Sequence, residues 1–391
     1  MADTKALRLP LGLRLATAAF LTMWAAVALF PLLWTAIMSF RLPVDALAGS
    51  PLTVLAGPET LARVGGLSPV AMLLGVAVFA SFYMLPGLAG AAVAARLAPQ
   101  GNIALGWVAA GLLYAALGAA TALWLLPAAA GVLQAALAPI PVAGWLGKPL
   151  VGVTMEHYAS VWIKNGFWRN FDNSMLVTFG VVSISLTVGT LAGYGLARAR
   201  SSLAFWLLIA ALIFRALPYS VLVAGYLPVF INSREILEPL LGDAAPTLYG
   251  QPWAVIMVLV AINQPFTIWM LRSFFQNIPP ELDEAARVDG CSHFGAFWRV
   301  IMPVMWPGVI TTGLFSFLLA YNDYLVTALL LDAQSQTMVP AISGFLNRDT
   351  STTDQIEAIA AAVSITAPLF VLVMVFQKQI VAGLTLGAVK G

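Results

Sequence analysis

Long apolar segments separated by short polar links constrain this chain more than any other feature of its sequence. A helix needs roughly 20 apolar residues to cross a bilayer, and in lipid only helices or closed barrels satisfy the backbone. We expect about eight such spans, near 15–40, 69–95, 103–126, 173–197, 204–230, 252–271, 307–331 and 357–377. Only 9% of the residues are charged, against about 25% in a soluble domain. The sequence therefore predicts an all-α polytopic membrane protein with about eight transmembrane helices.

The links between these spans differ in character. Residues 41–68 have the composition of an external loop, and the polar stretch 150–172 is expected to lie outside the bilayer. Residues 127–149 are apolar but contain several prolines, which predicts an interfacial or re-entrant helix. The first run follows Lys5, Arg8 and Arg14 but is too long for a signal peptide, so we expect a retained anchor.

The distribution of basic residues predicts the orientation. More of the 19 Lys and Arg residues fall on the side of the N-terminus than on the opposite side, as the positive-inside rule describes for cytoplasmic loops. Both termini are therefore expected in the cytoplasm, together with the polar stretch 279–303. The tail after Lys378 reads as a short flexible end.

The stretch 279–303 is the longest charged interruption in the C-terminal half. Pro279 and Pro280 suit a helix start, and the acidic residues that follow suit the positive end of a helix dipole. Gly290 is placed to end that helix. Apolar residues from Phe294 to Ile301 then recur at helical spacing, and Pro303 is expected to stop this second, amphipathic helix. An ordinary cytoplasmic loop with a capped helix is the alternative.

Residues of this stretch carry a family resemblance. Glu284-Ala285-Ala286, Asp289-Gly290 and the later Ile301-Met302-Pro303 resemble the EAA loop of ABC importer permeases. The segment FTIWMLRSFFQNIPPELDEAA, the tail FQKQIVAGLTLGAVKG, Asn173-Ser174 and Tyr194-Gly195-Leu196-Ala197-Arg198 are similar to elements of the carbohydrate-importer, MalG-like branch. Longer permeases of this kind occur among α-glucoside importers.

This resemblance implies a function and a set of partners. The chain would be the permease subunit of a binding-protein-dependent ABC importer that moves an oligosaccharide or α-glucoside across the bacterial inner membrane by alternating access. Its partners would be a second, MalF-like permease, a dimer of MalK-like ATPase subunits and a periplasmic or extracellular sugar-binding protein. The ATPase-coupling residues it implies are Glu284, Ala285, Ala286, Asp289, Gly290 and Pro303.

The resemblance also implies a division of the chain. Residues 1–44 would hold the N-terminal tail and first helix, and residues 45–155 an inserted region with two extra transmembrane helices and an external segment. Residues 156–391 would form the type I ABC importer permease core, with the coupling loop at 275–303.

Polar residues within predicted spans suggest a translocation pathway. A carboxylate inside a bilayer is costly, so Asp323 should face a cavity, a partner or the bundle interior. The group Tyr321-Asn322-Asp323-Tyr324 resembles a family element, and its aromatic and hydroxyl groups suit a sugar path. Arg215 shares this candidate role, and a structural role is the alternative for both. Asn263-Gln264-Pro265 predicts a break in the span 252–271.

Composition and motifs weaken several other functions. The single Cys291 and two histidines offer little for metal sites or Ser/His/Asp catalysis, and no GxxxxGK[ST] motif is present. We therefore expect no enzyme activity and no bound cofactor, with ATP and Mg used by the partner ATPase. The net charge of +2 does not suggest nucleic acid. An importer for another solute, an ion-coupled secondary transporter and a membrane-embedded transferase remain the alternatives.

Overall fold

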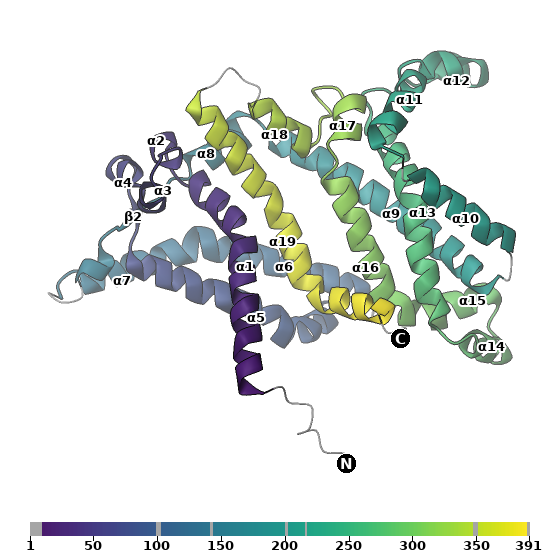
Figure 1. Ribbon diagram of the computed structural model, residues 1–391, viewed down its shortest axis with the longest axis horizontal. Coiled ribbons are helices and arrows are strands. Elements are labelled where there is room, and N and C mark those ends of the chain that lie inside the picture. Colours follow the sequence, from purple (N-terminus) through teal and green to yellow (C-terminus); the bar gives the residue numbers. More distant parts are fainter. Residues whose placement is uncertain are drawn as a thin grey trace. The chain divides into compact units, whose positions relative to one another are not determined.

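The computed structural model describes residues 10–98, 103–140, 144–199, 202–215, 217–346 and 351–388. Within these ranges the chain forms two compact units, Met1–Lys164 with Phe345–Ala367 and Asn165–Gly344 with Pro368–Gly391 (Figure 1). Among the described residues, five helical stretches are long and apolar enough to cross a membrane, namely Leu11–Ser39, Trp168–Arg198, Pro252–Gln276, His293–Tyr321 and Thr352–Gln377. Shorter apolar helices account for the other predicted spans. The predicted all-α polytopic fold class is therefore confirmed.

The first unit contains a long helix, a small folded segment and a helical hairpin. Its elements are α1 (Leu11–Ser39), α2 (Pro43–Ala46), α3 (Pro51–Ala56), α4 (Pro58–Arg63), β1 (Gly66–Leu67), α5 (Pro69–Leu97), α6 (Ile103–Ala120), η2 (Thr121–Leu125), α7 (Leu126–Leu137), η3 (Gly144–Gly147), β2 (Val151–Gly152), α8 (Glu156–Ala159) and η4 (Ser160–Lys164). The two short strands pair antiparallel, with Gly66 opposite Gly152. The N-terminal Lys5 and Arg8 lie outside the described residues.

Two buried charged side chains organise the small segment that follows α1. Arg41 is 4% exposed and donates hydrogen bonds to the carbonyls of Val54 and Leu55 at the end of α3 and to that of Gly152 in β2. Asp45 is 1% exposed and accepts from the N–H of Thr60 at 2.6 Å, near the start of α4. The two charges thus satisfy backbone groups that the helix ends leave free. Residues 41–68, expected as a loop, are folded for this reason.

The helical hairpin shows that the start of the proline-containing stretch 127–149 is helical and continues from the predicted span 103–126. α6, η2 and α7 form one continuous helix from Ile103 to Leu137, so Pro127 does not interrupt it. The π turn η2 lies directly before this proline. Its wider i→i+5 pattern accommodates a residue that lacks an N–H and crowds the preceding turn.

The second unit is a helical bundle built around α9. Its elements are α9 (Trp168–Arg198), α10 (Ser202–Arg215), α11 (Tyr219–Ile231), α12 (Ser233–Leu241), η5 (Gly242–Ala244), α13 (Pro252–Gln276), α14 (Glu281–Val288), α15 (His293–Ala296), η6 (Phe297–Ile301), α16 (Met302–Tyr321), α17 (Leu325–Leu330), and α18 (Met338–Leu346), whose last two residues belong to the first unit. α19 (Thr352–Ala388) contributes residues to both units. It is helical through Ala388, which corrects the flexible tail predicted after Lys378; residues 389–391 lie outside the described part.

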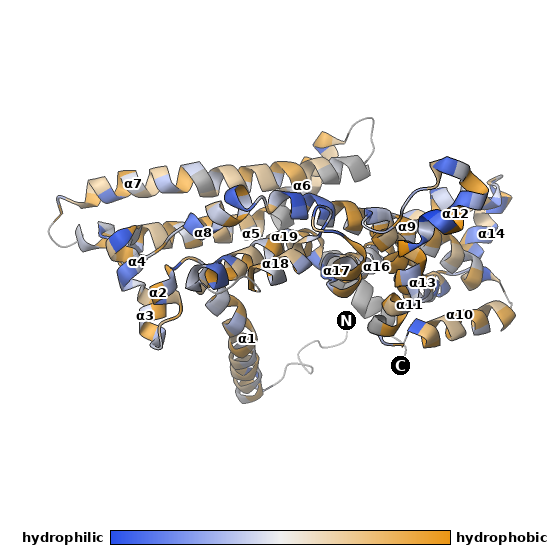
Figure 2. Cartoon of the chain, turned by 90° about the horizontal axis from the view of Figure 1, so that it is seen from above, coloured by the Kyte–Doolittle hydropathy of each residue, from blue (hydrophilic) through white to orange (hydrophobic). Residues whose placement is uncertain are grey.

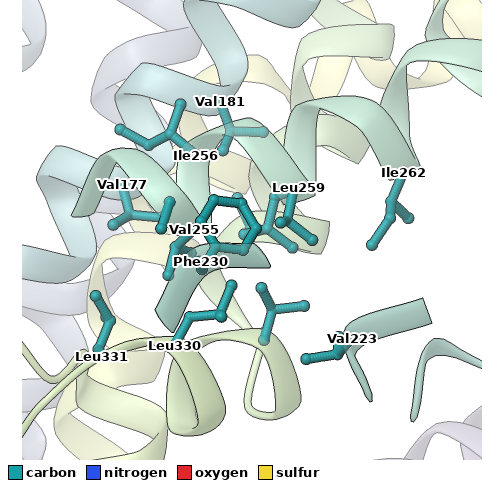
Figure 3. Packing of buried hydrophobic residues seen from close by; sticks show 14 residues of the cluster. Val177, Val181, Val223, Phe230, Val255, Ile256, Leu259, Ile262, Leu330 and Leu331 are labelled. Atoms are coloured by element: carbon teal, nitrogen blue, oxygen red, sulfur yellow. The ribbon is translucent and has the colours of Figure 1, made fainter. Parts of the chain in front are cut away.

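Small residues on α9 allow its close packing on α13. A Cβ added to Gly189 would lie 2.6 Å from Thr267 Cγ2, and one added to Gly193 would lie 3.0 Å from the backbone nitrogen of Arg272. Small residues at such contacts let helix backbones approach each other in a membrane protein. Figure 3 shows the apolar core beside this contact, where α9 supplies Val177 and Val181.

Two predicted spans are broken in the structure. The span 204–230 is divided into α10 and α11, with Pro218 immediately before α11. Proline disfavours the helical conformation in the residue that precedes it, which explains the division at this point. The span 307–331 is divided into α16 and α17. There the side chain of Asn322 donates to Leu318 O at 3.1 Å, and the carboxylate of Asp323 accepts from Thr327 N at 3.0 Å. The Asn322 side chain adds a second donor to Leu318 O, which also accepts from Asn322 N, whereas the Asp323 carboxylate accepts from a backbone N–H in the first turn of α17.

The break predicted at Pro265 is absent, because α13 is continuous from Pro252 to Gln276. Polar side chains surround the proline in the bundle. Asn263 is 1% exposed and donates to Ser316 Oγ at 2.8 Å, and Thr267 Oγ1 donates to Asn263 O at 3.2 Å. Polar contacts with neighbouring helices help transmembrane helices to tolerate proline, although Thr267 bonds a carbonyl other than that of Ala261, which Pro265 leaves without its usual donor.

Candidate functional site

The polar stretch after α13 folds as a helix, a glycine turn and a second helix, as predicted. Figure 1 shows α14 and α15 at one end of the bundle of α9, α13 and α16, with α12 and α17 at the other end. In Figure 2, α12 and α14 carry hydrophilic stretches whereas α10 is mainly hydrophobic. α14 is therefore a short polar helix presented at the end of long apolar ones.

The turn after α14 has the hydrogen bonds of a Schellman motif. Cys291 N donates to Ala286 O at 3.0 Å, and Gly290 N donates to Arg287 O at 3.1 Å. Gly290 has φ +91°, a conformation that glycine adopts without the steric cost of a Cβ. The prediction that Gly290 ends the helix is confirmed.

The second helix does not stop at Pro303, which corrects the sequence prediction. α15, η6 and α16 run without interruption from His293 to Tyr321. The helix begins at Ser292, whose side chain accepts from Gly295 N at 3.1 Å. Just before the proline, Met302 N donates to Phe297 O in the π turn η6. This wider turn precedes Pro303 as η2 precedes Pro127, so both prolines are carried within longer helices.

The residues predicted to couple to an ATPase differ in exposure. Glu284, Ala285, Asp289 and Gly290 are exposed on α14 and its turn, whereas Ala286 is 5% exposed. Pro303 is exposed on α16. The side chains at 284 and 285 are thus available to a partner, while Ala286 faces this chain.

Asp283 links α14 to the end of α9, a contact that the sequence analysis missed. Its Oδ1 accepts from the hydroxyl of Tyr194 at 2.6 Å, and its Oδ2 accepts from Nε of Arg198 at 2.7 Å. The side chains of Arg198 and Asp283 are 21% and 13% exposed. The sequence held one signal for this contact, namely the spacing of Tyr194 and Arg198. Residues four apart lie on the same face of a helix, so these two side chains could be expected to bind one partner together.

Arg198 also contacts the end of α13. Its Nη1 donates to Phe275 O at 3.3 Å and to Ile278 O at 3.2 Å. Its Nη2 is buried and has no hydrogen-bond partner among the described residues. Loss of Asp283 would therefore leave a largely buried charge with too few partners, which is a strongly unfavourable arrangement.

Aromatic and aliphatic side chains fill the space beneath this contact. The ring of Tyr194 lies 5.5 Å from that of Phe275 and 4.8 Å from that of Phe297, measured between centroids. Both phenylalanines are buried, together with Leu271 and Ile301. The packed rings join the ends of α9 and α13 to the start of the helix that contains α16.

The residues predicted to line a pathway lie on two different elements. Tyr321 is buried at the end of α16, and Asn322, Asp323 and Tyr324 form the break before α17. Arg215 ends α10, where its guanidinium carbon lies 4.8 Å from the ring centroid of Phe266 in α13. In the part of the chain that the structure describes, no ion pair joins Arg215 to Asp323.

Metal-binding residues do not cluster in the described ranges, where no group of three or more His, Cys, Asp or Glu side chains is placed to hold an ion.

Comparisons with known proteins connect these features to a family. The chain is 32% identical over 241 residues to the diacetylchitobiose uptake system permease protein DasC of Streptomyces coelicolor, covering 61% of this chain and 82% of that one. It is 32% identical over 240 residues to the trehalose transport system permease protein SugB of Mycobacterium tuberculosis, covering 61% and 83%. A solved bacterial ABC transporter that imports alginate aligns at 19% identity with a TM-score of 0.43, covering 72% of this chain and 98% of that one, which is too distant to support an argument.

Residues 185–385 match the family described as the binding-protein-dependent transport system inner membrane component. This region holds the end of α9, the α14 turn and the helix through Tyr321. The chain therefore belongs to the family of binding-protein-dependent transport system inner membrane components, which form the membrane-spanning part of ABC transporters.

Proposed function

We propose that this chain is the permease subunit of an ATP-driven importer that moves a sugar, either an oligosaccharide or an α-glucoside, by alternating access. The observation that carries the proposal is the exposure of Glu284 and Ala285 on a short polar helix at the end of the bundle. Relatives named for diacetylchitobiose and trehalose support a sugar as the solute.

The proposed mechanism requires partners for every step that consumes ATP. A sugar-loaded binding protein docks on one side of the membrane, and a MalK-like ATPase dimer, which uses ATP and Mg, closes on the other. Because α14 is exposed and ends in a fixed glycine turn, it can dock into that dimer as a rigid body. A second, MalF-like permease would complete the pathway. Both termini of this chain would lie in the cytoplasm, on the same side of the membrane as α14.

The proposed roles of the remaining residues follow from their positions. The break formed by Asn322, Asp323 and Tyr324 interrupts a helix beside the buried Tyr321, where polar side chains and aromatic rings could meet a sugar. Arg215 lies at another break, between α10 and α11. Residues 45–155 would be an insertion into the permease, since the matched family region begins at residue 185.

ATPase measurements on the assembled complex test this function. The chain is co-expressed with candidate neighbouring subunits, and ATP hydrolysis is measured with and without a sugar-loaded binding protein. Combining Glu284→Lys with Gly290→Pro should abolish the stimulation while the complex stays assembled, because it reverses a charge on α14 and removes the φ +91° turn. Glu235→Lys reverses an exposed charge on α12 and serves as the matched control.

The outcomes separate the alternatives. Stimulation by one sugar that is lost in the double variant identifies both role and solute, and stimulation by a different solute retains the importer but rejects the sugar. If no ATPase co-purifies and the double variant transports like the unmodified chain, the proposal is wrong and an ion-coupled transporter is favoured.

A further inference from the structure

We propose that α9 acts as a rigid helix that transmits displacement of α14 through the membrane. We further propose that a hydrogen-bonded cluster of Tyr194, Arg198 and Asp283, called the clasp below, attaches α14 to α9. This inference rests on the proposed function, because it assigns the path by which docking of α14 reaches the far end of the bundle. It concerns contacts within this chain and leaves the surface that meets the ATPase unchanged.

The clasp engages both carboxylate oxygens of Asp283. One oxygen accepts from Tyr194 at 2.6 Å and the other from Arg198 at 2.7 Å, so the side chain is fixed in direction as well as in distance. Charge-assisted hydrogen bonds of this kind are about twice as strong as neutral ones. By contrast, the pair of Arg63 with Glu59 has side chains 65% and 49% exposed, where ion pairs contribute little.

Arg198 prevents the link between α13 and α14 from absorbing motion. The same guanidinium that binds Asp283 also binds the carbonyls of Phe275 and Ile278, at the end of α13. The residues between these helices include Pro279 and Pro280, whose φ angles are fixed by their rings. A displacement of α14 therefore moves the end of α9 with it.

α9 is suited to transmit that displacement. It spans 31 residues, from Trp168 to Arg198, which at 1.5 Å per residue is about 46 Å. It contains no proline, whereas α13 and α16 carry Pro265 and Pro307 within their lengths. Proline is one main cause of sharp kinks in helices, and α9 lacks it.

The opposite end of α9 is clasped as well. Asn170 Nδ2 donates to Gln336 O at 2.8 Å, and Asn173 Nδ2 donates to Gln334 O at 3.3 Å and to Gln336 O at 3.2 Å. Ser174 Oγ accepts from Met338 N at 2.9 Å. The loop 332–338, which follows the break at Asn322–Tyr324 and α17, is thus tied to the same helix that holds α14.

Hydrogen–deuterium exchange on the reconstituted complex tests this path. In the unmodified chain, ATP binding should change amide exchange both in α14 and in the loop 332–338. In Asp283→Asn, which keeps the shape of the side chain but removes its charge, α14 should still respond while the loop does not. Solute imported per ATP should fall about fivefold or more, the lower end of typical coupling between sites. Glu281→Gln removes an equal charge from the same turn of α14, is exposed, and should behave as the unmodified chain.

Further variants keep the test decisive if Asp283→Asn assembles poorly. Tyr194→Phe keeps the ring packing and removes one hydrogen bond, so a smaller loss in the same direction is expected. The double variant with Arg198→Gln and Asp283→Asn should import no less solute per ATP than Arg198→Gln alone, because both substitutions disrupt the same contact. Asn173→Ala should reduce the response of the loop and leave that of α14 intact.

The results distinguish this inference from the proposed function. One outcome rejects the role of the clasp and retains the proposed importer function. In that outcome the binding protein stimulates ATP hydrolysis by the unmodified complex, and the variant that combines Glu284→Lys with Gly290→Pro is inactive. Asp283→Asn nevertheless imports solute with normal coupling, and its loop 332–338 still responds to ATP. If the unmodified complex shows no stimulation, the proposed function itself is rejected.

Discussion

Replacing Gly189 with alanine should destabilise the bundle, whereas the same change at Gly195 should not. Both glycines lie in α9, so both substitutions gain about 1 kcal/mol of helix propensity. At Gly189 the new Cβ would lie 2.6 Å from Thr267 Cγ2 and 3.2 Å from Leu271 Cδ1. Carbon atoms pack best at about 3.5–4.0 Å, so the first contact is too short by about 1 Å. A Cβ added at Gly195 would have no neighbouring atom of the described residues within 4 Å.

The difference between the two variants isolates the packing cost. Thr267 is fully buried, and its hydroxyl donates to Asn263 O, so its methyl group has little freedom to withdraw. Overpacking of this kind typically costs about 1–3 kcal/mol. In detergent, thermal denaturation of the purified chain should show Gly189→Ala melting several degrees below Gly195→Ala, at roughly 2–4 °C per kcal/mol. Equal melting temperatures would refute the close approach of α9 and α13.

Three further perturbations test other contacts. Phe205→Leu removes the ring that lies 5.1 Å from the guanidinium carbon of Arg272, so thermal denaturation should show a loss of about 0.5–2 kcal/mol; no change would reject the cation–π contact. Asp45→Asn weakens the cap of α4 and should cost about 1–2 kcal/mol by the same assay, unlike the exposed Glu59→Gln. Burial lowers the pKa of His157 and outweighs the opposing hydrogen bond with the carbonyl of Arg41. The first unit should therefore lose stability as pH falls below about 6.5, where the unfolded imidazole gains a proton first, and His157→Gln should abolish this slope.

The sequence predicted the helical membrane fold because apolar runs of this length have few alternatives in lipid. It also predicted the end of α14 at Gly290, where a positive φ singles out one residue type. Membership of the family confirms the importer permease core that the EAA resemblance implied.

Prolines were the main source of error in the sequence analysis. Pro265 was expected to break a helix and Pro303 to end one, and both lie within continuous helices, as does Pro127. Whether a proline interrupts a helix depends on a π turn before it or on hydroxyls of neighbouring helices, and neither is a local property of sequence.

The clasp at Asp283 could not be predicted from the pattern of the loop. An acidic residue in the first turn of a helix already has a sufficient local explanation in the helix dipole. Its partners, Tyr194 and Arg198, are distant in sequence and meet it only after α9 and α13 have packed. The coupling and pathway residues remain predictions whose positions are now known.

The π turn at Phe297–Ile301 also sets the rotation of α15 about the helix axis relative to α16. Each residue of an α-helix advances it by about 100°, so one extra residue within a continuous helix rotates everything before it relative to everything after it. The direction in which α15 projects from α16 is therefore set partly by the number of residues in η6, and the turn at Gly290 joins α15 to α14. Removing one residue there should rotate α15 relative to α16 and disturb the packing of both α15 and η6 against α14. If α14 docks on an ATPase as proposed, the number of residues at this turn would contribute to the docking geometry, and no comparison of side chains would reveal that contribution.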